Sequence, residues 1–257
     1  MKNKKPVRRR ARLKDEEREM ISETFIDPFN NPNPIKRTIK VSQLPWTDKQ
    51  KDFFRIALNH DTKIVFVNGP AGTSKSLLAV YCGLQLLNMK AISDIMYLRS
   101  AVESSDSKLG YLPGTAEDKL RFYNLPFLDK LDELLPTTRA EKLEQEGRIS
   151  MFPVNFARGM NWKSKCVILD EAQNSSLKEI TTVLTRLGEG SRCFVLADPM
   201  QTDLRNRDQI GGFEKLYKTF TDQESQSRGI HTFAFDEDDI MRSELCKYIV
   251  KKVKHIK

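Results

Sequence analysis

Eight consecutive residues combine glycines, a lysine and hydroxyl groups in an order suited to binding phosphate. They are Gly69, Pro70, Ala71, Gly72, Thr73, Ser74, Lys75 and Ser76. Glycines let backbone N–H groups surround phosphate oxygens, and a helix that begins there adds its positive end. We expect Lys75 to reach the outer phosphates of a nucleoside triphosphate and the Ser76 hydroxyl to complete a magnesium shell. The segment therefore predicts a phosphate-binding loop.

One residue of this loop departs from the usual pattern. Ser74 stands immediately before the lysine, where the standard pattern has glycine. If that position needs a backbone conformation open mainly to glycine, the serine carries a free-energy cost. The alternative is a glycine-rich turn with an incidental lysine, but the lysine–hydroxyl pair and the other glycines favour a phosphate-binding loop.

Two acidic residues lie about 95 residues downstream of the lysine. The apolar run 166–169 predicts a buried strand, and Asp170 and Glu171 follow at its carboxyl end, where ligands bind in parallel sheets. We expect Asp170 to hold magnesium through water and Glu171 to polarise the attacking water. Alone, such acids equally well cap the next helix; together with the loop they indicate a nucleotide hydrolase, because most small-molecule kinases need no water activator.

A third polar group follows another apolar run, 192–197. The side-chain amide of Gln201 is a candidate sensor of the γ-phosphate. A plain loop is the alternative, and the spacing leaves both interpretations open.

The elements that must position these residues alternate along the chain. Short apolar runs rich in β-branched residues predict strands over 63–68, 94–98, 165–169, 192–197 and 230–235. Helices are expected over 47–58, which starts with capping-box spacing, over 77–87 and over 238–254. This alternation indicates an α/β fold, a mostly parallel sheet with helices on both faces. A helical insertion is expected at about 115–148, and a short strand or hairpin arm at 35–44.

Composition and charge limit the class of protein. Hydrophobic residues make up 39% and charged residues 30% of the chain, which fits a globular protein. We find neither an apolar run of about 20 residues, as a membrane span needs, nor a secretion signal, so we expect a cytoplasmic protein. Residues 1–14 hold eight lysines and arginines and no acid, which equals the whole net charge of +8. This basic arm is either a contact for nucleic acid or a solvated tail.

The cysteines and one acidic run do not indicate metal sites. Cys82, Cys166, Cys193 and Cys246 are far apart, which predicts reduced thiols and no zinc site. The four acids of 236–239 are consecutive, so they cannot converge on two metals as a nuclease requires. We interpret them as the acidic start of the closing helix.

Several motifs in a constant order resemble the PhoH family, phosphate-starvation-type P-loop ATPases whose core is similar to that of superfamily 1 helicases. The resemblance covers about residues 45–252 and is carried by 69–76, 98–114, 153–159, 167–176, 184–192, 197–204 and 235–250. It implies a RecA-like P-loop NTPase fold in a single core domain, residues 45–257, after a basic arm and linker, residues 1–44. The short chain and its arm resemble phage-encoded forms, which implies the host cytoplasm, and the nuclease domain fused to some relatives is expected to be absent.

The resemblance also implies roles for individual residues. It assigns Lys75 and Ser76 to phosphate and magnesium, Asp170 and Glu171 to magnesium and water activation, and Gln201 to γ-phosphate sensing. It suggests Gln50 as an adenine contact. Ser74 departs from the family pattern, and so does Ser100, where the family often has proline.

Four arginines are candidates for roles outside the loop. Helicases of this type usually have two cores, one of which supplies an arginine to the other, and this chain has room for one core. The resemblance therefore implies a ring of subunits, a hexamer, with an arginine finger in trans. Arg186 is the first candidate finger and Arg242 the second. Arg99 and Arg158 either line a path for nucleic acid or make internal ion pairs.

These features together predict magnesium-dependent ATP hydrolysis coupled to binding, translocation or unwinding of single-stranded RNA or DNA. The alternative is a nucleotide-dependent switch or assembly module that acts on a protein partner. A P-loop kinase is a third class, but no sequence feature specifies its acceptor pocket or lid.

Overall fold

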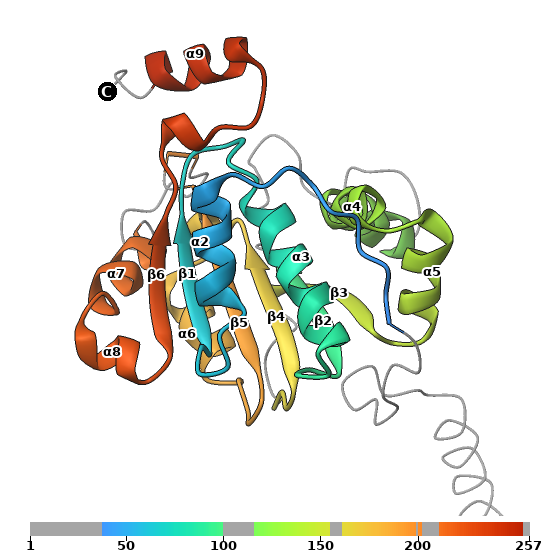
Figure 1. Cartoon of the computed structure of the whole chain (residues 1–257). Helices are drawn as coiled ribbons and strands as arrows, with labels where there is room; N and C mark the ends of the chain where they lie inside the picture. Colours follow the sequence, from blue (N-terminus) through green and yellow to red (C-terminus); the bar gives the residue numbers. More distant parts are fainter. Residues whose placement is uncertain (1–37, 100–115, 155–160, 199, 202–210, 254–257) are drawn as a thin grey trace, which may run out of the picture.

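The computed structural model describes residues 38–99, 116–154, 161–198, 200–201 and 211–253. Within these residues, six parallel strands form one sheet in the order β3-β2-β4-β5-β1-β6 (Figure 1). The strands are β1 (Ile64–Asn68), β2 (Asp94–Arg99), β3 (Ile149–Pro153), β4 (Lys165–Asp170), β5 (Arg192–Ala197) and β6 (Ile230–Ala234).

Helices cover both faces of this sheet. The described helices are α2 (Asp48–Ala57), α3 (Lys75–Asn88), α4 (Ala116–Leu134), α5 (Thr137–Gln145), α6 (Leu177–Leu184), α7 (Gly212–Thr219), α8 (Gln223–Ser227) and α9 (Glu244–Val253). Of these, α9 lies apart from the sheet (Figure 1). Two short 3-10 turns, η3 (Ala172–Asn174) and η4 (Glu237–Asp239), follow β4 and β6. The predicted α/β fold with a single core domain is confirmed.

The helices pack on two separate hydrophobic clusters because successive side chains of a strand point to opposite faces. Val65 and Val67 of β1 belong to one cluster, together with apolar residues of α2, α3, α4 and α5. Phe66, between them, belongs to the other, together with residues of α6 and α7. Strands buried on both sides need continuous apolar runs, which is why these segments were recognisable in the sequence.

The strand order gathers the predicted site segments at one edge. All strands of the sheet run in the same direction, so the loops after β1, β4 and β5 leave from the same edge. β5 lies between β1 and β4 and pairs with both. The segment that carries Gln201 is therefore placed between the phosphate-binding loop and the acidic end of β4.

One predicted element and one predicted boundary are wrong. The described part of the expected strand 35–44 has no regular secondary structure. Instead, Ile39 is buried and its backbone N–H and carbonyl bond the Asn88 side chain at 2.7 and 2.9 Å. The closing helix begins at Glu244 and not at 238, because Asp236 caps η4 and pairs with Lys49 at 2.8 Å. The acidic run 236–239 therefore forms a separate 3-10 turn, which salt bridges to Lys49 connect to α2.

The edge strand β3 was not predicted. Its sequence, Ile149–Pro153, contains a serine and ends in proline, so it lacks the apolar β-branched pattern of the other strands. Proline is tolerated there because β3 pairs on one side only, with β2.

Cys82, Cys166 and Cys193 are buried and free, as the sequence predicted, and burial raises the pKa of each thiol. No group of three or more metal-binding side chains occurs within the described ranges. The helices described here are all too short or too polar to span a bilayer.

Candidate nucleotide-binding site

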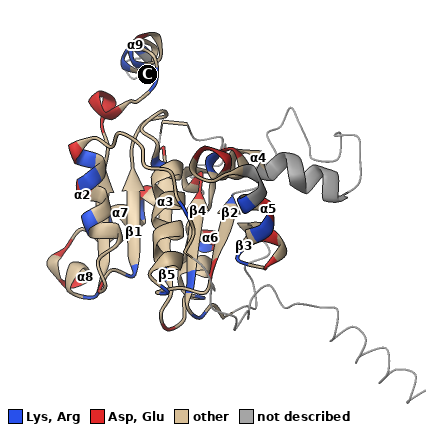
Figure 2. Cartoon of the chain, turned by 45° about the vertical axis from the view of Figure 1, so that its right-hand side comes forward, with Lys and Arg blue, Asp and Glu red and all other residues tan. Residues whose placement is uncertain are grey.

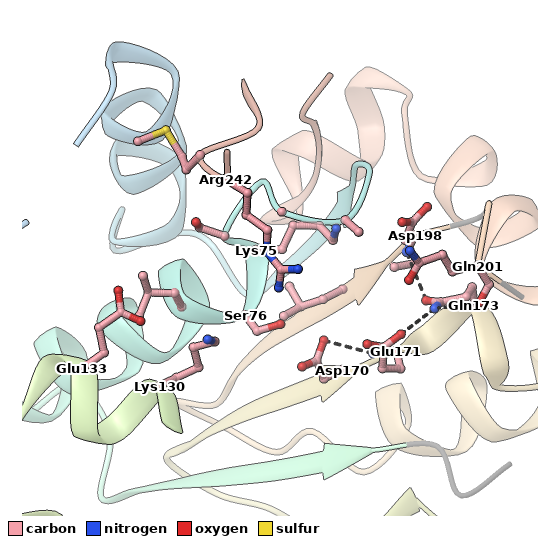
Figure 3. Close-up of a pocket in the computed structure, with 17 residues that line it drawn as sticks. Lys75, Ser76, Lys130, Glu133, Asp170, Glu171, Gln173, Asp198, Gln201 and Arg242 are labelled. Atoms are coloured by element: carbon pink, nitrogen blue, oxygen red, sulfur yellow. Dashed lines mark hydrogen bonds between the residues drawn. The ribbon is translucent and has the colours of Figure 1, made fainter. Parts of the chain in front are cut away.

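A cavity of about 370 Å³ lies at the carboxyl edge of the sheet (Figure 3). Nine of the residues predicted for the site line it: Ala71, Gly72, Ser74, Lys75, Ser76, Asp170, Glu171, Gln201 and Arg242. The loop after β1, the end of β4, the loop after β5 and the segment before α9 thus meet at one place. These segments are far apart in the sequence, and the strand order brings them together.

The phosphate-binding loop is closed by its own lysine. The Lys75 ammonium donates to the carbonyl oxygens of Gly69 and Pro70 at 2.7 and 3.0 Å. The Thr73 hydroxyl donates to the Pro70 carbonyl at 2.9 Å. Gly69, Pro70 and Thr73 do not line the cavity; they shape the loop through these bonds. Burial lowers the pKa of Lys75, while the charges of Asp198, Asp170 and Glu171 oppose that shift.

Ser74 adopts the backbone conformation that explains the glycine of the standard pattern. Its φ and ψ are 63° and 20°, in the left-handed region. An L-residue with a Cβ pays about 1–2 kcal/mol there, which glycine does not. Gly72, two residues earlier, has φ 88°. The loop therefore carries backbone strain at Ser74, at the start of α3.

Asp170 is held in one orientation by two hydrogen bonds. Its Oδ2 accepts from the Tyr97 hydroxyl at 2.8 Å, and its Oδ1 accepts from the Glu171 backbone N–H at 3.0 Å. Asp170 is buried at the end of β4, and Tyr97 lies beside it on β2. Because each carboxylate oxygen keeps further lone pairs, this residue is a preoriented oxygen donor for a hard cation.

Glu171 is strained and partly desolvated. Its φ of 54° and ψ of 38° place a non-glycine residue in the left-handed region, as is common at functional sites. Burial raises the pKa of its carboxyl group, and the charge of Asp170 adds to this shift. A hydrogen bond from Gln173 and the charges of Arg99 and Lys75 oppose it. The carboxylate is thus tuned by its neighbours towards a stronger base.

Gln173 joins three parts of the site, and sequence reasoning missed it. Its Nε2 donates to Glu171 Oε2 at 2.6 Å and to the Gln201 carbonyl at 3.2 Å. Its Oε1 accepts from the Asp198 backbone N–H at 3.0 Å. The amide is buried, so these bonds satisfy it internally. In the sequence, Gln173 could have been identified only by its position three residues after Asp170, and the uncharged amide was overlooked beside two acids.

Not every predicted residue reaches the cavity. The buried side chain of Gln50 completes the capping box of α2, where its Oε1 accepts from the Thr47 N–H at 3.0 Å, and it does not line the cavity. Arg186 is half-buried after α6 and is likewise not a lining residue. Arg99, at the end of β2, lies near enough for its charge to lower the pKa of Glu171. Arg158 lies outside the described residues.

Arg242 lines the cavity of its own chain. The neighbouring Met241 N–H donates to the Gly72 carbonyl at 2.9 Å. A Cβ added at Gly72 would lie 3.3 Å from Cγ and Cδ of Arg242. The segment before α9 thus rests directly on the phosphate-binding loop. Two further lining residues, Lys130 and Glu133, come from α4, which the sequence had marked only as a helical insertion.

The donors in the cavity fit a magnesium nucleotide. Ser76 and Asp170 offer the hydroxyl and carboxylate oxygens that magnesium prefers. Lys75, Lys130 and Arg242 offer positive charge, and the start of α3 offers backbone N–H groups to phosphate.

Comparison with known proteins identifies the family. The family model for PhoH-like protein matches residues 43–254. A PhoH-like protein of Synechocystis sp. is 33% identical over 205 residues, which cover 80% of this chain and 60% of the relative. A PhoH-like protein of Bacillus subtilis is 34% identical over 188 residues, covering 73% of this chain and 57% of the relative. That of Mycobacterium tuberculosis (strain ATCC 25618 / H37Rv) is 34% identical over 187 residues, covering 73% and 51%.

The chain therefore spans about half to three fifths of the length of these curated relatives, from 51% to 60%. Among solved structures, the flagellar accessory protein FlaH from Methanocaldococcus jannaschii overlaps with a TM-score of 0.27 at 12% identity, over 83% of this chain and 76% of that one. This overlap is too loose to bear on fold or function. The match over most of the chain shows that it belongs to the PhoH family, a family of P-loop ATPases.

Proposed function

We propose that this protein binds ATP with magnesium and hydrolyses it. One observation carries the proposal: a single cavity is lined by Lys75 and Ser76 from the loop after β1 and by Asp170 and Glu171 from the end of β4. These two strands are separated by β5 in the sheet, so the meeting of the four side chains follows from the fold.

Each group has a separate task in this mechanism. The backbone of the loop and the Lys75 ammonium bind the phosphates, and Ser76 and Asp170 would hold magnesium. The ion, when bound, neutralises charge on the phosphate oxygens. Glu171 polarises a water for attack, as a carboxylate whose basicity is increased by burial. The bond from Gln173 keeps this carboxylate pointing in one direction.

The same amide supports a role for Gln201. Gln173 binds both the Glu171 carboxylate and the Gln201 carbonyl. A movement of the Gln201 segment on loss of the γ-phosphate would therefore reach Glu171 through one side chain. This makes the loop after β5 the proposed sensor of hydrolysis.

We further propose that hydrolysis is coupled to single-stranded RNA or DNA. The support is the basic arm of residues 1–14, which carries the whole charge excess, and the resemblance of the core to helicases. On the described helices α2, α4 and α5, basic and acidic side chains are interspersed (Figure 2). Electrostatic attraction to phosphate backbones would then be concentrated in the arm.

The test measures phosphate release from ATP with and without single-stranded RNA and DNA, at two salt concentrations. We expect hydrolysis that nucleic acid stimulates, that weakens as salt rises, and that is lost in Glu171→Gln. No hydrolysis by the wild-type protein under any of these conditions would contradict the proposal of an ATPase.

A nucleotide-dependent switch acting on a protein partner is the second candidate. It is favoured by α9, which lies apart from the sheet in Figure 1 and exposes Leu245, Tyr248 and Ile249 by 67, 59 and 50%. These side chains begin three residues after Arg242, so a partner bound to α9 would be close to the nucleotide. Hydrolysis that is indifferent to RNA and DNA would favour this function.

A further inference from the structure

The helix α4 brings a positive charge to the nucleotide cavity. Lys130 is half-buried and lines the cavity together with Glu133 of the same helix. Figure 3 shows the Lys130 ammonium and the Arg242 guanidinium both directed towards Ser76, one from α4 and the other from the segment before α9. Ser76 is the residue proposed to hold magnesium beside the outer phosphates, so two cations converge on that point in addition to Lys75.

Packing fixes the position of Lys130. Phe127, Leu131 and Leu134 of α4 are 0, 1 and 0% exposed and belong to the hydrophobic cluster that α3 shares. The Phe127 ring stacks on Tyr97, with centroids 4.6 Å apart and planes at 21°. Tyr97 in turn donates to Asp170. The turn of α4 that presents Lys130 is therefore anchored to the tyrosine that orients the proposed magnesium ligand.

Among the described residues, Lys130 has no carboxylate partner for its charge. None of the ion pairs within the described ranges involves Lys130 or Arg242. Three of the six lysines that make ion pairs in the described residues do so with a carboxylate three or four residues away along the chain, for example Lys142 with Glu146. Glu133 lies three residues after Lys130, but no ion pair joins the two, and both line the cavity. Holding a long side chain in a half-buried place costs rotamer entropy, which a charge-assisted hydrogen bond to an anionic ligand would offset.

We propose that Lys130 contacts the outer phosphates of the bound nucleotide from the side of α4, and that nucleotide affinity therefore depends on how α4 packs. This inference rests on the proposed function. It makes the insertion helix a part of the nucleotide site.

The experiment compares the affinity for magnesium-ATP of the wild-type protein with that of three variants, by calorimetric titration. In Lys130→Met and Lys130→Gln we expect affinity to fall about tenfold, the effect of one charge-assisted hydrogen bond in a partly solvated site. Lys130→Arg keeps the charge and is expected to stay within about threefold of the wild type. Two neutral variants are used so that poor folding of one does not decide the result.

Lys142→Met is the matched control, because Lys142 lies on the neighbouring helix α5, is 61% exposed and does not line the cavity. Binding by the neutral Lys130 variants that equals binding by Lys142→Met would overturn the inference while leaving the ATPase intact. Lys75→Ala serves as the reference for the proposed function. Wild-type protein that binds no better than Lys75→Ala would overturn the ATPase and the inference together.

Discussion

At the scale of residues, two residues of the candidate site adopt left-handed backbone conformations, which favour glycine. Ser74 and Glu171 have φ values of 63° and 54°. Such strain persists where the surrounding structure enforces it, and here both residues end or begin an element that carries site residues. The strain at Ser74 was suspected from the sequence; that at Glu171 was not.

Ser74→Gly is expected to raise the free energy of unfolding by about 1 kcal/mol, because glycine relieves the left-handed strain. Denaturant titration of the nucleotide-free protein measures it. The reverse change, Gly211→Ser, is the control: Gly211 has φ 80°, and an added Cβ would meet no atom of the described residues within 4 Å, so the expected loss reflects backbone strain. An unchanged or lower stability of Ser74→Gly would show that the serine side chain stabilises the loop in another way.

The pH dependence of hydrolysis tests the environment of Glu171. Only the ionised carboxyl group can polarise water, so the rate should fall on the acid side with a midpoint above the ordinary pKa of 4.5, since burial raises the pKa of Glu171. Gln173→Leu removes the hydrogen bond that lowers this pKa and should move the acid limb to higher pH. The measurement is kcat/KM as a function of pH, which reports the ionisation of the free protein. An acid limb at the same pH in both proteins would count against Glu171 as the titrating group.

The raised pKa of Glu171 also affects the stability of the fold. The folded protein binds the Glu171 proton more tightly than the unfolded chain, so the ionised carboxyl group destabilises the fold above about pH 4.5. That cost disappears as pH falls from the raised pKa of the folded protein to about 4.5. Glu171→Gln, the control for hydrolysis, is thus also expected to be more stable than the wild type at neutral pH.

At the scale of elements, one end of the sheet carries the candidate site and the other end carries a buried ion pair. The carboxyl edge holds strained loops and ionisable groups, whereas the other end of β2 and β4 is tied by a buried ion pair. Lys165 donates to both oxygens of Asp94 at 2.7 and 2.9 Å, and their side chains are 0 and 1% exposed. This pair fixes the start of the strands whose far ends carry Arg99 and Asp170.

Lys165→Met is expected to destabilise the protein by about 3 kcal/mol or more, because it leaves a buried carboxylate without its partner. The double variant Lys165→Met with Asp94→Asn should lose less, since no buried charge remains. Thermal or denaturant unfolding checks both. Equal losses in the single and double variants would show that packing, and not the unpaired charge, dominates.

At the scale of the whole molecule, the proposed ring requires an arginine that one subunit supplies to another. The structure separates the two candidates by position: Arg242 lines the cavity of its own chain and Arg186 does not. Arg186 is therefore the better candidate for a role in trans, and Arg242 for a role in cis.

Mixing inactive variants tests this division. When Arg186→Ala and Lys75→Ala subunits are mixed in equal amounts, about a quarter of the interfaces pair an intact site with an intact finger in a random ring, so phosphate release should reappear. The same mixture with Arg242→Ala in place of Arg186→Ala should stay inactive, because each site then lacks a group of its own chain. The opposite pattern would exchange the roles of the two arginines.

Local patterns were enough to predict the α/β fold and the principal site residues. The buried strands are continuous apolar runs, and the loop and the acids lie directly beside them, so Lys75, Ser76, Asp170 and Glu171 were recognisable by position. The capping box at Thr47 was predicted for the same reason, since it depends on residues three apart. β3 and the true start of α9 were missed because pairing with β2 and the contact with Lys49 are not local.

What the sequence by itself determined is therefore the set of elements and the chemistry placed at their ends, because backbone propensity, glycine and charge act over a few residues. The tertiary structure alone decided which side chains share one cavity. It added Gln173, Tyr97 and Lys130 to the site and put Arg242 in its own chain's cavity. The physical reason is that the cavity is assembled from loops joined only through strand order and helix packing, which no short stretch of residues specifies.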